Sequence, residues 1–206
     1  MARKTKTEAN KTRDAILDAA ERVFYAHGVA RTTLEQIAAD AKVTRGAVYW
    51  HFQDKIQIVD AMMSRVFLPQ EDILERLAQS GSDQPLDDLK HACCEALRTM
   101  GKDKRRNRVV SIMMHRCEYV EEMAPIMKRR RACKDRMLAR SLKLFEQAHE
   151  LRQLAAPWTP RLAALSLQAM MTGLITSALE GRKAFDLAKT APTCLEAFFR
   201  SIAKGR

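Results

Sequence analysis

Two short helical segments separated by a very short break are the feature that most constrains the fold of this chain. Residues 34–41 carry apolar side chains at helical spacing, and Thr33 with Gln36 forms a capping-box pattern at their start. Only Lys42-Val43 separates them from residues 44–52, a second segment that opens on the capping residue type threonine. Two short helices joined by so tight a turn predict a helix-turn-helix unit.

Helices are also predicted on both sides of this pair. One begins near Lys11 and stops at His27, where Gly28 follows, and another begins at Lys55 after the capping residue Asp54. We expect the pair to be held rigid by a small set of apolar side chains. These are Ile37, Ala38, Ala41, Val43, Val48 and Phe52.

The rest of the chain is helical in pattern and less regular, so we predict an all-α protein. The whole chain has only seven Gly and six Pro in 206 residues, as helical proteins do. Breaks fall at Pro69 and at residues 80–85. Further helices are expected at 86–100, 107–118, 124–150, 160–180 and 191–203, the last opened by Thr190 and Pro192. The predicted organisation is a disordered basic arm at 1–9, a three-helix DNA-binding domain at 10–56 and a larger helical bundle at 57–206.

The second helix of a helix-turn-helix unit enters the DNA major groove while the first braces it. Arg45 can fork onto guanine O6 and N7, and Tyr49 lies four residues later on the same helical face. Gly46 and Ala47 allow a close approach of the backbone, whereas Trp50 and Phe52 are expected in the core. The predicted DNA-contact residues are Thr33, Thr44, Arg45, Gly46, Ala47, Tyr49, His51 and Lys55. The alternative is a helical hairpin whose polar side chains are only solvated.

Charge alone does not locate this interface. The formal net charge is +11, but residues 1–60 hold 10 basic and 8 acidic side chains, so most of the excess lies elsewhere. Two basic runs, at 102–108 and 128–140, are interpreted as solvated helix faces, with an anionic ligand or flanking DNA as the alternative.

Residues 12–59 carry a dense set of motifs. They are AILDAA, F-Y-x-x-G, T-T-x-x-x-I-A and V-T-R-G-A-V-Y-W-H-F-x-x-K. This region resembles the N-terminal domain of TetR-family transcriptional repressors. RKTKTEA at the start, HRCEY at 115–119 and FDLAKTAP at 185–192 resemble the AcrR, TtgR and MtrR-type members, which control multidrug efflux pumps. The resemblance implies DNA contacts from Thr33, Thr44, Arg45, Tyr49, His51 and Lys55, a homodimer, and release from a pseudo-palindromic operator by a hydrophobic inducer.

The resemblance also implies that the last two long helices form the dimer, and the residues agree. Small side chains follow one another at steps of three and four residues along 160–180, which permits close approach of a second helix. The predicted interface residues are Leu162, Ser166, Ala169, Met170, Gly173, Ser177, Leu195, Phe198, Phe199 and Ile202. The alternative is that the same faces pack within one chain.

The resemblance places an inducer pocket among the bundle helices, and the many methionines suit varied apolar molecules. Ordinary core packing is the alternative reading of those methionines. The predicted lining is Leu97, Val110, Met114, His115, Cys117, Glu118, Met137, Gln168, Met171, Thr172 and Ile175. Where related repressors carry an acid before the glycine of 160–180, this chain has Thr172, so a preference for cationic drugs is not implied.

Other function classes have weaker support in the sequence. His91, Cys93, Cys94, His115 and Cys117 fit no tight metal-ligand spacing, so a redox or metal sensor is an alternative and no cofactor is expected. No catalytic motif is present, and a helical small-molecule carrier that does not bind DNA is the alternative from another class. Residues 162–179 lack charge but contain Ser, Thr and Gln, and the N-terminus has no apolar signal segment. We therefore expect a cytoplasmic protein with reduced thiols and no membrane partner.

Overall fold

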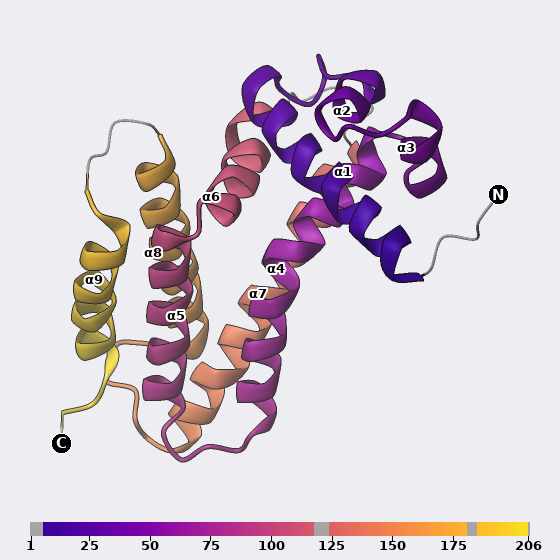
Figure 1. Cartoon of the computed structure of the whole chain (residues 1–206). Helices are drawn as coiled ribbons and strands as arrows, with labels where there is room; N and C mark the ends of the chain where they lie inside the picture. The colour runs from indigo at the N-terminus through magenta and orange to yellow at the C-terminus, as the bar shows by residue number, and fades with distance from the viewer. Residues whose placement is uncertain (1–5, 118–123, 181–184, 206) are drawn as a thin grey trace. The chain divides into compact units, whose positions relative to one another are not determined.

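The computed structural model describes residues 6–117, 124–180 and 185–205, and these are almost entirely helical. They form two compact units (Figure 1). Unit 1 comprises the chain up to Val66 together with residues 105–130, and unit 2 comprises residues 67–104 and 131–206. The long helices α4 (Lys55–Gln79) and α7 (Ala124–Glu150) contribute residues to both units. The predicted boundary between domains, at residue 57, therefore falls inside unit 1 rather than between the units.

Unit 1 is built on α1 (Lys6–His27), against which α2 (Leu34–Asp40) and α3 (Arg45–His51) pack. Ile16 and Phe24 of α1 are fully buried together with Ile37 of α2 and Val48 of α3. Val48 is the side chain that fixes α3 onto the unit, because its immediate helical neighbours are exposed or half-exposed. Residues 6–9 were predicted in a disordered arm, but they form the first turn of α1 and Thr12 Oγ1 donates to the Glu8 carbonyl.

Unit 1 also contains α6 (Lys104–Ser111), apart from its first residue, and a π-helix, η1 (Ile112–Arg116). The predicted α-helix at 107–118 is therefore wrong in both its start and its regularity. Tertiary hydrogen bonds accompany the wider turn, since Val29 N–H donates to the Arg116 carbonyl at 3.0 Å and Arg130 donates to the Met113 carbonyl at 3.0 Å. Gly28, with φ of 82°, provides the left-handed residue that ends α1 beside this contact.

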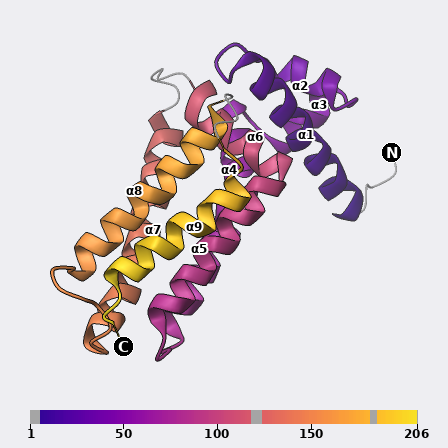
Figure 2. The ribbon, with the colours of Figure 1, turned by 90° about the vertical axis from the view of Figure 1, so that its left-hand side faces the viewer.

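Unit 2 is a helical bundle in which α9 (Leu187–Ile202) lies between α5 (Pro85–Lys102) and α8 (Pro160–Leu179), as Figure 2 shows. Phe145 of α7 stacks on Phe199 of α9 at a centroid distance of 6.3 Å. The start of α9 was predicted at residue 191. It lies at Leu187 because the Asp186 side chain accepts hydrogen bonds from the Ala188 and Lys189 N–H groups.

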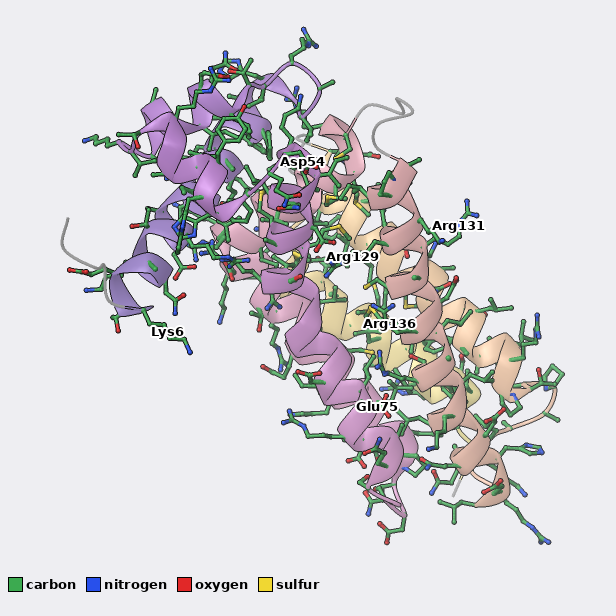
Figure 3. The ribbon with its side chains drawn as sticks, turned by 90° about the vertical axis from the view of Figure 1, so that its right-hand side faces the viewer. Lys6, Asp54, Glu75, Arg129, Arg131 and Arg136 are labelled. Atoms are coloured by element: carbon green, nitrogen blue, oxygen red, sulfur yellow. The ribbon has the colours of Figure 1, made fainter. Side chains whose placement is uncertain are left out.

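The break predicted at Pro69 is also absent, since α4 runs without interruption from Lys55 to Gln79. A proline removes only one backbone donor from this helix of 25 residues. In unit 2, Arg140 of α7 donates to Glu75 of α4 at 2.5 Å. In unit 1, Arg129 of α7, labelled in Figure 3, forms an ion pair with Asp60 and donates a hydrogen bond to Ser64. Two residues of the basic run at 128–140, Arg129 and Arg140, are thus ion-paired within the protein rather than only solvated.

Among the described residues, α8 is the one helix that is long and apolar enough to cross a membrane by length and composition. Its mean hydropathy is 1.5 over eighteen residues, and 17% of that window is buried within the chain. An apolar helix left this exposed needs a partner for its open face, and a second copy of the chain is one such partner.

Candidate nucleic-acid interface

The short helix α3 has one exposed face and one buried face. Successive residues of a helix are turned by about 100°, so Arg45, Gly46, Tyr49 and Trp50 occupy one continuous arc. All four are exposed, while Val48 on the opposite side is fully buried. Ala47, at the edge of the arc, is half-buried. Three of the sequence-predicted residues, Arg45, Gly46 and Tyr49, therefore lie together on one outward surface, and Trp50 lies beside them.

Arg45 is held in place by partners on two helices. Its Nε lies 2.9 Å from Oε1 of Glu35 on α2, and its Nη2 donates to the Tyr49 hydroxyl at 3.3 Å. The guanidinium also lies over the Tyr49 ring, 5.3 Å from the centroid. These contacts raise the pKa of Arg45, with the Tyr49 hydrogen bond as the first cause, so it stays charged at any relevant pH.

Thr33 and Thr44 act as N-caps of α2 and α3. Thr33 Oγ1 accepts from the Gln36 N–H at 3.2 Å, and Thr44 Oγ1 accepts from the Ala47 N–H at 3.2 Å. The Thr33 N–H in turn donates to the Gln36 side chain at 2.8 Å, which completes the predicted capping box. A capping hydroxyl keeps its own proton, which Thr44 can still donate outward, whereas the Thr33 hydroxyl donates to the Glu35 carboxylate.

Gly46 has open space where a side chain would be. A Cβ placed there would meet nothing of its own chain closer than Thr44 Oγ1 at 4.0 Å. Packing inside the protein therefore does not require glycine at this position. An external surface that approaches the backbone of α3 does give a reason for it.

Lys55, a predicted DNA contact, makes hydrogen bonds within the protein. Its Nζ donates to the carbonyl oxygens of Val29 and Ala30, at 3.0 and 2.8 Å, and is partly buried. The ammonium therefore closes the connection between α1 and α2 from the start of α4. This internal use competes with a phosphate contact.

Trp50 is the residue that sequence reasoning misplaced. It was expected in the core, yet it is 73% exposed, and its ring meets His51 edge-on at a centroid distance of 4.5 Å. Phe52, expected in the core as well, is buried at 3% exposure. The 100° rotation between residues would have separated the two, since Trp50 shares the arc of Arg45 and Tyr49.

The residues predicted to line an inducer pocket are divided between the units. Val110, Met114, His115 and Cys117 belong to unit 1, and Glu118 lies outside the described residues. Leu97, Met137, Gln168, Met171, Thr172 and Ile175 belong to unit 2, where Gln168 donates to the Lys134 carbonyl at 3.1 Å. The pocket itself stays a prediction.

Unit 1 also contains a cavity of about 380 Å³ that is lined in part by His51 at the end of α3 and shares no residue with that predicted pocket. It is lined by Phe52, Ile56, Ala61 and Ile126, with polar groups from Arg13 and Asp60.

The predicted dimer interface separates into two groups. On α8, Leu162, Ala169, Gly173 and Ser177 are exposed, Ser166 and Met170 are half-buried, and Leu165 is exposed beside them. On α9, Leu195, Phe198, Phe199 and Ile202 are all buried. These four side chains lie in the core of unit 2 and offer little surface to a second chain, so the interface on α9 stays a prediction.

Cys93 and Cys117 have little thiolate character. Burial raises the pKa of Cys93 to about 12 and that of Cys117 to about 11. Within the described ranges, no group of three or more His, Cys, Asp or Glu side chains is arranged to hold a metal ion. Neither finding favours a thiol or metal sensor.

A three-helix unit that presents a helix-turn-helix, followed by a helical bundle, defines a DNA-binding transcription regulator. Comparison with known proteins identifies the family. Residues 16–62 match the model of the tetR family of bacterial regulatory proteins, and residues 84–203 match the C-terminal region of MAATS-type transcriptional repressors. The chain belongs to the TetR family of transcriptional repressors.

Three relatives illustrate the match. The repressor BepR of Brucella suis is 42% identical over 90% of this chain and 88% of its own length. NalD, the secondary repressor of the MexAB-OprM multidrug efflux pump in Pseudomonas aeruginosa, is 38% identical with a TM-score of 0.87, covering 98% of this chain and 100% of NalD. SmeT, the repressor of the Stenotrophomonas maltophilia pump SmeDEF, solved with triclosan, is 34% identical with a TM-score of 0.86, covering 94% and 92%.

Proposed function

We propose that this protein is a ligand-responsive repressor that binds a pseudo-palindromic operator as a homodimer in the cytoplasm and is released by a hydrophobic small molecule. We further propose that it controls a multidrug efflux pump operon. The observation that carries the DNA-binding part is the exposed arc of α3. There a charged Arg45, an open Gly46 and two aromatic side chains face outward together.

Each residue of the arc has a role that its chemistry suits. The Arg45 guanidinium reads guanine, and the Tyr49 hydroxyl and Thr44 donate to phosphates. Trp50 offers an apolar face to a thymine methyl group. Two copies of α3, about 34–36 Å apart in the dimer, would enter successive major grooves of one operator.

The ligand and the pump are supported by similarity. NalD and SmeT repress multidrug efflux pumps, and SmeT has been solved with triclosan, an apolar small molecule. An inducer can release the operator only as far as it binds the released state more tightly than the DNA-bound state. The methionines of the predicted pocket suit such a ligand because their side chains adapt to varied shapes.

The test begins with the operator. Purified protein is incubated with fragmented source DNA at near-physiological salt, and the retained fragments are sequenced. We expect one or a few palindromes beside efflux-pump genes or beside the gene for this protein. Recovery of bulk DNA without a motif would mean that the protein binds DNA only through its net charge of +11, and the repressor assignment would fail.

Variants then locate the contact. Arg45→Ala is expected to weaken operator binding at least about fivefold and relax discrimination at one base pair. Tyr49→Ala should weaken binding without changing which base is preferred. Tyr25→Ala is the matched control, because Tyr25 is exposed to the same degree, 43% against 44%, on α1. Equal losses in the two tyrosine variants would remove α3 as the reading element.

A further inference from the structure

We propose that Glu35 is a positioning residue that makes Arg45 a base reader rather than a phosphate clamp. The inference rests on the proposed operator binding and adds to it the residue that sets guanine discrimination. Its basis is the arrangement of Glu35, Arg45 and Tyr49, which joins the bracing helix α2 to the recognition helix α3.

The geometry leaves a defined part of the guanidinium available. A guanidinium carries five N–H donors in a rigid planar fork. Glu35 engages Nε at 2.9 Å and Tyr49 engages Nη2 at 3.3 Å, so among the described residues Nη1 has no bonding partner. The Nη1–Nη2 end of the fork therefore remains for an external partner. Guanine O6 and N7 match such a fork.

Glu35 is itself fixed before DNA arrives. Its own backbone N–H and the Thr33 side chain donate to its carboxylate, and together with Arg45 they lower its pKa below the ordinary value. The carboxylate is thus ionised at neutral pH. Because α2 is anchored by its capping box and by the buried Leu34 and Ile37, this anchor does not depend on bound DNA.

Two physical consequences follow for DNA binding. An arginine held in one rotamer loses less conformational freedom when it docks on a base than a free one does. An ionised carboxylate at the DNA-facing surface also repels phosphates, which opposes binding to any sequence. Glu35 therefore lowers general affinity while it raises the preference for guanine.

The alternative is an ordinary exposed ion pair that opens when DNA binds. The side chains of Arg45 and Glu35 are 63% and 49% exposed, and such pairs contribute little to stability. In that case Glu35 would act on DNA only through its charge. The two interpretations predict different base preferences for a variant that keeps the carboxylate charge at position 35 but cannot reach Arg45 Nε.

The experiment compares Glu35→Gln, Glu35→Asp and wild-type protein on three duplexes: the operator, the operator with its guanine contact changed to adenine, and a random sequence. Aspartate keeps the charge but is one methylene too short to hold Nε. We expect both Glu35 variants to lose about 2- to 10-fold in their preference for the operator over the duplex in which guanine is changed to adenine. Only Glu35→Gln should bind the random duplex more tightly, with a steeper salt dependence, because it alone removes the carboxylate charge that repels phosphates.

Arg45→Ala provides the internal control. In that background, Glu35→Gln should leave base preference unchanged, since there is no guanidinium to position. If Glu35→Asp keeps wild-type preference while Glu35→Gln raises affinity for all three duplexes equally, the positioning role is overturned. If wild-type protein shows no operator preference, the proposed function and this inference fail together. If only Arg45→Ala loses preference, the proposed function stands and this inference fails.

Discussion

At the scale of single residues, the least expected group is the buried carboxylate of Glu21 on α1. It is 2% exposed, and Arg108 Nε lies 2.8 Å from its Oε1, with Arg105 at 3.7 Å. Burial raises the pKa of Glu21 above its ordinary value of 4.5, although both arginines act in the opposite direction. The folded protein therefore holds the proton more tightly than the unfolded chain does.

The raised pKa gives Glu21 a pH-dependent effect on stability with a defined sign. Its contribution is fully present below pH 4.5 and is lost as the pH rises through the raised value in the folded state. Glutamine resembles the protonated form, so Glu21→Gln should be no less stable than wild type at pH 7. The difference in unfolding free energy should move in favour of the variant between pH 4 and 7. Urea titrations at fixed protein concentration measure it.

The arginine side of the pair predicts the opposite result. Arg108→Met leaves a buried carboxylate without its nearest partner and should lower the unfolding free energy by about 1–3 kcal/mol at pH 7. Adding Glu21→Gln should restore most of that loss. A double variant no more stable than Arg108→Met alone would contradict this account.

Residue roles on α3 were predictable where the helical repeat decides them. Arg45 and Tyr49 are four residues apart and do share the exposed face. Trp50 was misplaced because aromatic character was given more weight than its position on the helix. Lys55 could not have been placed from sequence, since its partners are backbone carbonyls 25 and 26 residues earlier.

At the scale of elements, Lys55 links the start of α4 to the connection between α1 and α2. Lys55→Met should lower the stability of unit 1 by about 1–3 kcal/mol, because two carbonyl groups lose a charged donor. It should leave the salt dependence of operator binding unchanged. A direct phosphate contact would instead reduce the slope by about 0.9.

Thermal unfolding and binding titrations at several salt concentrations separate these outcomes. Lys204→Met removes an exposed lysine far along the sequence and serves as the control for loss of charge. A reduced slope together with unchanged stability would return Lys55 to the set of DNA contacts.

Element boundaries were predictable where local capping sets them. α2 and α3 begin directly after Thr33 and Thr44, as their capping patterns indicate. The π-helix η1 was not predictable, because its carbonyls bond to Val29 and Arg130, which are distant in sequence. The start of α9 was predictable in principle, because Asp186 is a strong capping residue that precedes the chosen Thr190.

At the scale of the whole molecule, α8 and α9 were predicted to share one interface, and the two helices differ in how exposed their predicted faces are. The apolar face of α9 is buried in the core of unit 2. On the exposed face of α8, the large Leu162 and Leu165 lie at one end, and the small Ala169, Gly173 and Ser177 continue the stripe. Sequence pattern shows that a face is apolar but not whether the same chain covers it.

The stripe carries the proposed homodimer, and Leu165→Arg tests it. A charge in the interface should shift the protein from a dimer towards the 23.4 kDa monomer in sedimentation equilibrium. Leu151→Arg is matched in exposure, 48% against 43%, and lies off the stripe, so it should stay dimeric. The same monomeric shift in both variants would point to a general loss of structure.

Gly173→Leu separates dimerisation from folding more cleanly. A Cβ at Gly173 meets no atom of its own chain within 4 Å, and leucine favours helix over glycine, so each chain should be at least as stable as before. A large side chain would nevertheless hold two α8 helices apart, so the dimer should dissociate at protein concentrations where wild type remains paired. Operator affinity should fall with it, because a monomer reaches one half-site only. Intact dimers with full operator affinity would mean that another face of the chain forms the pair.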